Sequence, residues 1–470
     1  SSSSSSSSRA AAPASESAEM RAAAAALCAL AALAGGAAGE RREWAVLVAG
    51  SRGYWNYRHH ADVCHAYHTL RARGIPDERI ITMMYDDVAA ALQNPFQGSL
   101  YNRPTDGSDA IDVYKGCKKD YTGSDVTPET FMAVLTGDAR RAGGPVLNST
   151  EEDDVFINFA DHGAPGLVAF PRGTLHARRL LRAFEVMHSK KMYRNLVFYL
   201  EACESGSMFA NLPEDRNIYA VTAANGRESS YATYCPPMDD RVNGKHINTC
   251  LGDEFSVHWL EDTDSEASGG KETLLEQFKR VRDNTRKSHV MDFGDVNQIS
   301  SEDISDFLGI AGDDSEPMRR AIRAHPYQVH ESALVDSRDV PLVSKMYRYM
   351  REPSKESQAE LHAEIQHRKD TDELFEKIAR ALLENEDEVS EVLTSPPPAA
   401  PTEWDCHEAA HEAFMDYCTK DHTWSDYSLK YSATLLALCE KLADKIPGGG
   451  HEDMVLRSIA TACDPMLAVA

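Results

Sequence analysis

Residues 154–163 have the sequence DVFINFADHG, an apolar run of strand length that ends in polar and small residues. A second run of this kind, NLVFYLEACESG, occupies residues 195–206, and further apolar runs occupy residues 44–50 and 79–85. Between the last two runs lie residues 61–73, whose pattern is helical. Continuous apolar strands separated by helices are typical of a mostly parallel sheet that is buried on both faces. The sequence therefore predicts an α/β fold with helices flanking the sheet.

Two reactive side chains directly follow strands of the predicted sheet. His162 follows the strand that begins at residue 154, and Cys203 follows the strand that begins at residue 195. In open α/β sheets, functional sites form at the carboxyl ends of the strands. A thiol held there as a thiolate can attack a carbonyl while a nearby imidazole protonates the departing amine. A lone His-Gly pair or a buried cysteine is usually structural, so the residues alone leave both interpretations open.

The character of the chain changes after about residue 336. Residues 356–393 carry apolar side chains at a spacing of four among many charges, which indicates amphipathic helix. Three prolines at 396–398 interrupt this pattern, and it resumes over residues 404–442. We therefore expect a separate helical domain. Its four cysteines are Cys406, Cys418, Cys439 and Cys463. They contain no Cys-x-x-Cys pair, so two disulfides are favoured over a metal site, and the sequence leaves all three possible pairings open.

The first forty residues are not expected to join the fold. Residues 1–19 are of low complexity, and residues 20–39 have the order of a secretory signal peptide, with Met20 as the expected start. Their apolar segment is shorter than the roughly 20 residues that a membrane span needs, so we expect a cleaved signal and no membrane span. Entry into the secretory pathway would permit disulfides and glycosylation of Asn148, which lies in an Asn-Ser-Thr sequence.

Composition restricts the partners. The 470 residues carry a formal net charge of -25, so the phosphates of a nucleic acid would be repelled and no such partner is expected. The length suits a catalytic domain and a smaller one. No cofactor or metal site is predicted, because the cluster of Cys64 with His60, His65 and His68 lies in or beside one predicted helix and reads as structural. Cys64 is expected to be a buried core thiol.

The order of these elements resembles the caspase-like cysteine peptidases, in which an apolar strand and His-Gly precede an apolar strand and Glu-Ala-Cys. Within them, the chain is similar to the legumain family of asparaginyl endopeptidases, or vacuolar processing enzymes, from Trp44 essentially to the C-terminus. The stretches that carry this similarity are VAGS at 48–51, NYRH at 56–59, ADVCHAY at 61–67, MMYDD at 83–87, DYTG at 120–123, TAAN at 222–225 and RESSY at 227–231. The resemblance implies a caspase-like peptidase domain over residues 40–335, an activation linker over 336–355 and a helical inhibitory prodomain over 356–470.

The resemblance also implies a role for each site residue. Cys203 would attack the scissile carbonyl, His162 would be its acid/base partner, Asn56 would orient the imidazole, and the backbone amides of Gly163 and Cys203 would stabilise the oxyanion. The S1 pocket, which holds the residue before the cleaved bond, would consist of Arg58, His59, Glu201, Ser229, Ser230 and Asp253. A carboxamide offers one acceptor and two donor hydrogens, so a pocket selective for asparagine needs both a cation and carboxylates.

Activation is expected to need acid. A substrate aspartate would repel Glu201 and Asp253, whereas protonated aspartic acid resembles asparagine, so cleavage after Asp requires low pH. No asparagine lies between Asn297 and Asn385, and the nearest candidates for self-cleavage in the linker are Asp336 and Asp339. The prodomain, the expected inhibitor, would be released when its carboxylates protonate. The expected substrates are proteins and peptides with an exposed Asn or Asp.

Cysteine positions add further expectations from the resemblance. They suggest the pairings Cys406–Cys439 and Cys418–Cys463, and a plant-type loop disulfide between Cys235 and Cys250, which favours a vacuole over a lysosome. Cys117 departs from the family pattern and is expected to be a free surface thiol. Three alternatives remain open, namely a peptide ligase of the same fold, suggested by Ala232 and residues 164–165, the catalytic subunit of a GPI transamidase, and an inactive peptide-binding homologue.

Overall fold

The computed structural model describes residues 42–265, 271–312, 314, 316–324, 333–419, 422–446 and 449–463. Residues 43–470 belong to one compact unit, and the account below concerns its described residues. The low-complexity segment and the signal peptide expected over residues 1–39 lie outside the described residues. None of the helices in the described part of the chain is long and apolar enough to cross a membrane.

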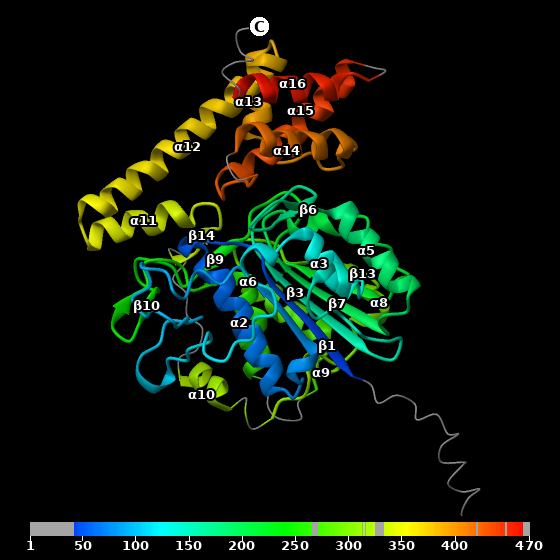
Figure 1. Ribbon diagram of the computed structural model, residues 1–470, viewed down its shortest axis with the longest axis vertical. Helices are drawn as coiled ribbons and strands as arrows, with labels where there is room; N and C mark the ends of the chain where they lie inside the picture. The colour runs from blue at the N-terminus through cyan, green and yellow to red at the C-terminus, as the bar shows by residue number, and fades with distance from the viewer. Residues whose placement is uncertain are drawn as a thin grey trace, which may run out of the picture. The chain divides into compact units, whose positions relative to one another are not determined.

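A six-stranded sheet forms the centre of the first part of this unit (Figure 1). Its strand order is β13-β8-β7-β3-β1-β2, and every neighbouring pair is parallel except β13 with β8. The strands are β1 (Glu43–Ala49), β2 (Ile80–Met84), β3 (Asp154–Ala160), β7 (Asn195–Glu201), β8 (Ile218–Thr222) and β13 (Met291–Gly294). The predicted mostly parallel α/β fold is confirmed.

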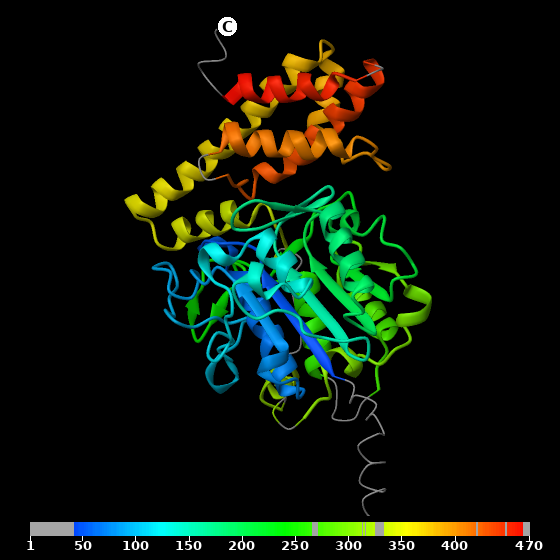
Figure 2. The same cartoon turned by 45° about the vertical axis from the view of Figure 1, so that its right-hand side comes forward.

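Helices cover both faces of this sheet (Figure 2). Successive side chains of β1 point to opposite faces, so Leu47 joins a core with the helices of one face and Val48 a core with those of the other. Helices of the first face include α2 (Tyr57–Ala72), α6 (Glu254–Ser265), α7 (Leu274–Asn284) and α9 (Ser305–Leu308), and those of the second include α3 (Pro128–Leu135) and α5 (Ala177–Ser189). Shorter or peripheral helices are α4 (Ala139–Ala142), α8 (Val296–Ile299) and α10 (Glu316–Ala324).

Three small sheets accompany the central one. One has the order β12-β9-β14, another the order β4-β5-β6, and the third is the hairpin β10-β11. Their strands are β4 (Gly163–Ala164), β5 (Leu167–Ala169), β6 (Thr174–His176), β9 (Tyr231–Thr233), β10 (Arg241–Val242), β11 (Lys245–His246), β12 (Gly252–Asp253) and β14 (Val335–Asp336). Strand β14 lies about a hundred residues after β9 in the sequence, so this sheet joins the expected linker to the peptidase part.

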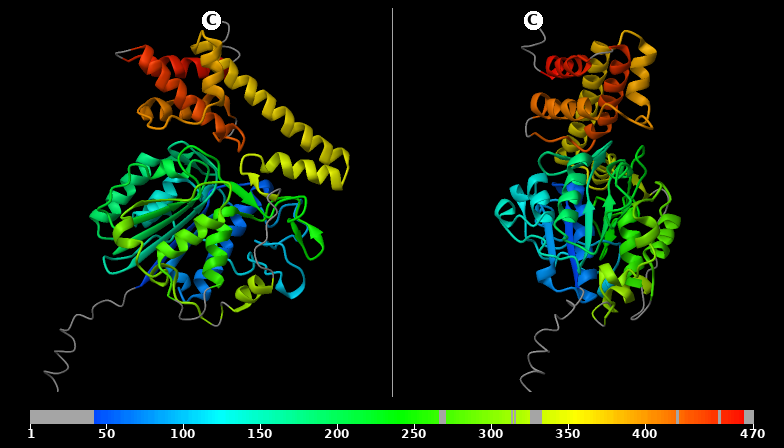
Figure 3. Two further views of the ribbon diagram at one scale, coloured as in Figure 1. Left: turned by 180° about the vertical axis from the view of Figure 1, so that it is seen from behind. Right: turned by 90° about the vertical axis from the view of Figure 1, so that its right-hand side faces the viewer.

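The chain after β14 is helical, as expected (Figure 3). Ser354 caps the first turn of the long helix α12, and the prolines at 396–398 fall between α13 and α14, where the sequence predicts a break. Phe375 stacks on Tyr431 with 4.3 Å between ring centroids, in a hydrophobic core that also includes Ala164 and Leu167 of β4 and β5. The helices are α11 (Val340–Arg351), α12 (Lys355–Leu382), α13 (Glu386–Thr394), α14 (Trp404–Cys418), α15 (Ser432–Lys445) and α16 (His451–Cys463).

Four disulfides are present among the described residues. Three join the cysteines that the family resemblance pairs, Cys235–Cys250, Cys406–Cys439 and Cys418–Cys463. The fourth joins Cys64 to Cys117, so the expectation of a core thiol and a free surface thiol was wrong. Both cysteines are buried, and the bond ties helix α2 to the loop that precedes residue 120. The lysines beside Cys117 suggested an exposed loop, but its side chain points inward.

Candidate active site

The ends of β3 and β7 bring His162 and Cys203 together. The two strands pair in parallel with Ala160 opposite Glu201, so His162 and Cys203 each lie two residues beyond a paired position. Immediately after Ala160, the amide of Asp161 donates to the carbonyl of Glu201 at 3.0 Å. A Cβ atom on Gly163 would lie 2.3 Å from the carbonyl oxygen of Cys203, so only glycine fits there. The two strand-end motifs therefore meet as the sequence predicts.

The imidazole of His162 is held by Asn56, which precedes helix α2. The amide nitrogen of Asn56 donates to the Arg52 carbonyl at 3.0 Å, so its Oδ1 faces His162 Nε2, 2.9 Å away, as the acceptor. Nε2 then carries the proton, and the buried Nδ1 has no hydrogen-bond partner in the described part of the chain. Burial lowers the pKa of His162 to about 4, and Asp426 opposes this. The ring is thus neutral with Nδ1 free to accept a proton.

Cys203 is the free cysteine of the described residues. Its Sγ lies 3.4 Å from the amide nitrogen of Ser230 and 3.8 Å from the Ser230 hydroxyl. Burial raises the pKa of this thiol to about 12, and the positive charge of Arg338 only partly offsets the effect. The thiol is therefore protonated in the structure described.

The charged residues of the expected S1 pocket come from three elements. Arg58 and His59 lie in the first turn of α2, Glu201 ends β7, and Asp253 lies in β12. Arg58 Nε donates to Asp253 Oδ1 at 2.8 Å, and Glu201 Oε2 accepts from the amide and hydroxyl of Ser256 at 3.0 and 3.1 Å. His59 Nδ1 lies 2.7 Å from the hydroxyl of Ser51. Each of these four side chains is buried and has at least one hydrogen-bond partner.

Four buried atoms of this group have no hydrogen-bond partner among the described residues. They are Arg58 Nη2, Glu201 Oε1, Asp253 Oδ2 and His59 Nε2, and the last two lie 3.5 Å apart. Burial raises the pKa of Glu201, as does the charge of Asp253, whereas Arg58 lowers it. Buried polar atoms normally have partners because leaving them unpaired costs about 1–3 kcal/mol each. One donor and two acceptors are thus available to a polar group.

The segment at residues 335–337 lies beside Ser230 of the expected pocket. Strand β14 pairs antiparallel with β9, with Val335 opposite Ala232 and Asp336 opposite Tyr231. The amide of Ser337 donates to the Ser230 carbonyl at 3.1 Å, and the two serine hydroxyls lie 3.3 Å apart. Because Ser230 also contacts Cys203, this segment runs as an added strand past the thiol.

Arg338 reaches both strand ends. Its guanidinium forms an ion pair with Glu204 at 2.6 Å and donates to the Gly163 carbonyl at 3.0 Å and to the Ser229 hydroxyl at 3.3 Å. Asp336 accepts the amide of Arg338 through Oδ1, and Asp339 is bound by Arg368 at 2.6 Å. Neither candidate cleavage residue therefore pairs with Arg58 in this arrangement.

The C-terminal helical region contacts the same area. Asp426 Oδ1 lies 3.3 Å from His162 Nε2, and both residues line a cavity of about 270 Å³. A Cβ on Gly166 would lie 2.4 Å from a ring carbon of Trp404, so this indole packs directly on the backbone after the His-Gly motif. Next to it, Arg178 pairs with Asp405 and Glu408 of α14. The helical region thus covers the surface of the peptidase part beside His162.

Three residues that form ion pairs in this area were not predicted from the sequence, namely Arg338, Glu204 and Asp426. Arg338 lies between Asp336 and Asp339, and Glu204 follows Cys203, so their positions next to predicted site residues could have indicated a role. Nothing in the sequence around Asp426 indicates one. The expected glycosylation residue, Asn148, is exposed. His59, Asp161 and His162 place ligand atoms within 4.8 Å of one another and could hold a metal ion, although thiol chemistry requires none.

Comparisons with known proteins identify the family of the chain. The model of the peptidase C13 family matches residues 43–310, and that of the legumain prodomain matches residues 359–448. Human legumain is 42% identical over 409 residues, which cover 85% of this chain and 89% of that protein. The delta isozyme of vacuolar-processing enzyme from Arabidopsis thaliana is 39% identical over 418 residues, covering 85% and 87%. Hemoglobinase of Schistosoma japonicum is 46% identical over 307 residues, covering 64% and 67%. The chain belongs to the peptidase C13 family and carries a legumain-type prodomain.

Proposed function

We propose that this cysteine peptidase cleaves proteins and peptides after asparagine, and after aspartic acid at low pH, and that it is made as a self-activating zymogen. Cys203 attacks the scissile carbonyl carbon, and the thiol proton passes through His162 Nδ1 to the departing amine. Water then hydrolyses the thioester with His162 as base and releases the acid product. The amides of Gly163 and Cys203 stabilise the oxyanion in both steps.

The observation that carries the asparagine specificity is the lack of hydrogen-bond partners for three atoms of the expected S1 pocket, one each from Arg58, Glu201 and Asp253. A carboxamide has one oxygen acceptor and an NH₂ group with two donors. Arg58 Nη2 supplies a donor for the oxygen, and Glu201 Oε1 and Asp253 Oδ2 supply acceptors for the two hydrogens. A site built to bond a polar group rejects analogues that leave its buried atoms unpaired, by factors of about 10⁴ or more.

The zymogen proposal rests on the state of the two reactive groups. The pKa of Cys203 is raised to about 12 and that of His162 is lowered to about 4, so an ion pair of thiolate and imidazolium is disfavoured. Residues 335–338 lie against Ser230, Gly163 and Glu204 at the same time. Together with Asp426, this segment excludes a substrate, and the prodomain acts as the inhibitor.

Activation is proposed to occur by cleavage after Asp336 or Asp339 in an acidic compartment, a vacuole or a lysosome-like organelle. The vacuolar name of the plant relatives supports this location. Because Asp339 is held by Arg368 and Asp336 lies opposite Tyr231, the segment must first leave the cleft. A protein carrying both Asp336→Ala and Asp339→Ala should not mature at acid pH, and normal maturation would contradict these sites.

The decisive experiment uses the purified proform at about pH 4 to 5. Its mass is followed over time, and peptides that differ only by Asn, Asp or Gln before the cleaved bond are then assayed beside a Cys203→Ser control. The expected result is shortening of the wild type, preference for Asn, slower cleavage after Asp, and no reaction of the control. A wild-type protein that neither shortens nor cleaves the Asn peptide would refute the proposal.

A further inference from the structure

One face of helix α2 carries a row of buried polar side chains behind the expected S1 pocket. Arg58, Asp62, His65 and Thr69 follow one another at intervals of four, three and four residues, which places them on one side of a helix. All four are at most 2% exposed, although polar residues are rarely buried without a network of partners. Arg58 is the pocket residue of this row, and the other three have had no role so far.

Asp62 connects this row to the pocket carboxylate. Its Oδ2 accepts the backbone amide of Asp253 at 3.1 Å, and its Oδ1 accepts the side-chain amide of Asn102 at 2.7 Å. Asn102 also donates to the carbonyl of Leu251 at 2.9 Å. A Cβ on Gly252, between these two backbone groups, would lie 3.0 Å from Asn102 Nδ2 and 3.1 Å from Asp62 Oδ1. The strand that carries Asp253 is therefore packed tightly against Asp62 and Asn102.

His65 is the next residue of the row after Asp62, and its hydrogen bonds show whether its ring is charged. The NH₂ group of Asn102 is used for donation, so its Oδ1, which lies 2.7 Å from His65 Nδ1, accepts a proton from the ring. His65 Nε2 lies 2.7 Å from Asp264 Oδ2, and Asp264 accepts the Thr69 hydroxyl through Oδ1. Burial lowers the pKa of His65, but the hydrogen bond and charge of Asp264, the hydrogen bond of Asn102 and the charge of Glu261 together outweigh it and raise the pKa overall. Both ring nitrogens thus donate, and the ring is an imidazolium.

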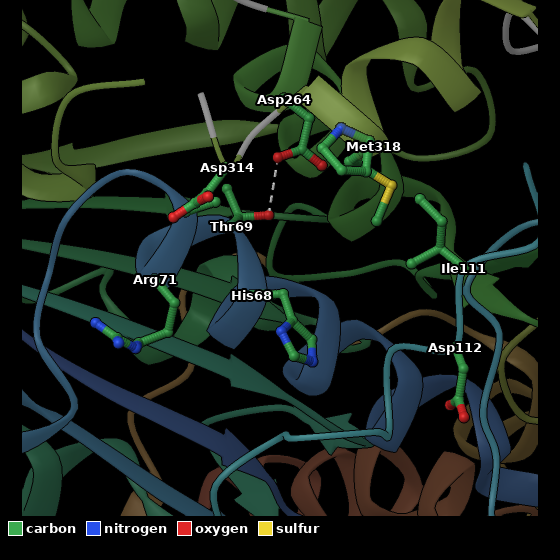
Figure 4. A pocket seen from close by; sticks show the side chains of 10 residues that line it. His68, Thr69, Arg71, Ile111, Asp112, Asp264, Asp314 and Met318 are labelled. Carbon is green, nitrogen blue, oxygen red and sulfur yellow. Dashed lines mark hydrogen bonds between the residues drawn. The ribbon is translucent and has the colours of Figure 1, made fainter. Parts of the chain in front are cut away.

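Figure 4 shows the outer end of the row, where Thr69 donates to Asp264. Both residues line a cavity of about 330 Å³, together with His68, which precedes Thr69 on α2. His68 does not belong to the row, because its Nε2 bonds the carbonyl of Val113. The row therefore runs from this cavity, through His65 and Asn102, to the backbone of Asp253.

We propose that His65, Asn102 and Asp62 are positioning residues that fix Asp253 and keep the S1 carboxylates ionised, so that they determine the preference for asparagine over aspartic acid. The inference rests on the function proposed above. The Asn carboxamide needs Asp253 and Glu201 as acceptors, whereas Asp is accepted only when protons are added to the pocket or the substrate. The ring of His65 holds Asn102, and Asn102 in turn holds Asp62 and the backbone beside Asp253.

Removal of the ring charge should raise the pKa values of Asp62, Asp253 and Glu201, which burial already raises. A pocket that protonates more readily loses acceptors for asparagine and repels aspartate less. His65→Gln should therefore lower the ratio of kcat/KM for Asn to that for Asp about tenfold, the scale of one charge-assisted hydrogen bond. The pH limit for cleavage after Asp should move upward.

The test compares activated wild type with His65→Gln, Thr69→Val and the control His68→Gln, with rates expressed per Cys203 site titrated by an irreversible alkylating agent. Thr69→Val removes one donor to Asp264 and should also lower the ratio of kcat/KM for Asn to that for Asp, by a smaller factor. This variant provides an independent test if His65→Gln folds poorly. His68→Gln should leave the ratio and the pH limit unchanged. Active His65→Gln and Thr69→Val proteins with the wild-type ratio would overturn the inference, as would an equal change in His68→Gln. A wild type without Asn cleavage would instead refute the proposed function.

Discussion

Arg338 forms an ion pair with Glu204, the residue that follows Cys203, at 2.6 Å. Both side chains are largely buried, and the same guanidinium donates to the carbonyl of Gly163, which follows strand β3. Breaking a buried pair by removing one partner costs about 3–5 kcal/mol, because the remaining charge is left without compensation. The linker is therefore anchored on both sides of the thiol by one residue.

Arg338→Ala should weaken this anchor and let the proform react at higher pH than wild type. The initial rate of Asn-peptide cleavage is measured on intact proform between pH 5 and 7, with mass spectrometry to exclude prior cleavage. Arg71→Ala serves as the control, because Arg71 pairs with Asp77 away from the cleft. An unchanged pH threshold in Arg338→Ala would show that the ion pair does not maintain latency.

Ser337→Asn should turn the inhibitory segment into a substrate. The amide of Ser337 donates to the carbonyl of Ser230, and Ser230 contacts Cys203, so residue 337 lies beside the thiol. Serine offers no carboxamide to the unpartnered atoms of Arg58, Glu201 and Asp253, whereas asparagine does. The proform should be cut between residues 337 and 338, which intact mass detects, and Ser337→Asn with Cys203→Ser should stay whole. An uncut single variant, in a protein that cleaves Asn peptides, would rule out this register.

The strand-end pair could be predicted because its information is local. The apolar run of β3 is followed at once by His162 and that of β7 by Cys203, and parallel strands bring such ends together. The ion pair of Arg338 with Glu204 joins residues 134 positions apart, and no periodicity records a contact of that range. The Cys64–Cys117 disulfide was missed for a similar reason, since Cys64 fits the apolar pattern of its helix and Cys117 lies 53 residues away.

The contact between the two domains contains three buried histidines that should sense acid. His411 stacks on Trp424 at 4.2 Å, and its ring lies 5.8 Å from that of His176 and 6.1 Å from that of His407. Burial lowers the pKa of His176 to about 4 and that of His407 to about 3, with Glu408 opposing and Arg178 and Arg179 adding to the effect at His176. The pKa of His411 is also lowered well below its usual value by burial.

The sign of the resulting pH dependence follows from proton linkage. Rings that are neutral when docked take up protons on release, so docking is strongest above their ordinary pKa of about 6.5 and weakens as the pH falls from there towards 4. Each histidine contributes up to about 1.4 kcal/mol per pH unit in that window. His411→Phe keeps the stacking on Trp424 without titrating, so release should need a lower pH.

Tryptophan fluorescence of Cys203→Ser proform, which cannot cut itself, reports this release, because Trp404 packs on Gly166. The midpoint in a pH titration should fall in His411→Phe by a fraction of a pH unit. His422→Gln provides the control, since His422 is an exposed histidine of the same domain. Equal midpoints in all three proteins would assign acid sensing to other groups.

Cys64 and Cys117 offer a test of stability that is separate from specificity. Their disulfide closes a loop with a sequence separation of 53 residues and ties down α2, the helix that carries Arg58 and His59. Restricting the unfolded chain over such a loop stabilises the fold by roughly 4 kcal/mol. The double variant Cys64→Ala/Cys117→Ala should lower the denaturation midpoint of the Cys203→Ser proform by a corresponding amount. It should also leave the thiol count of that protein unchanged, because both cysteines are already oxidised. Two additional free thiols in the unfolded parent, or an unchanged midpoint in the variant, would contradict a stabilising bond at this position.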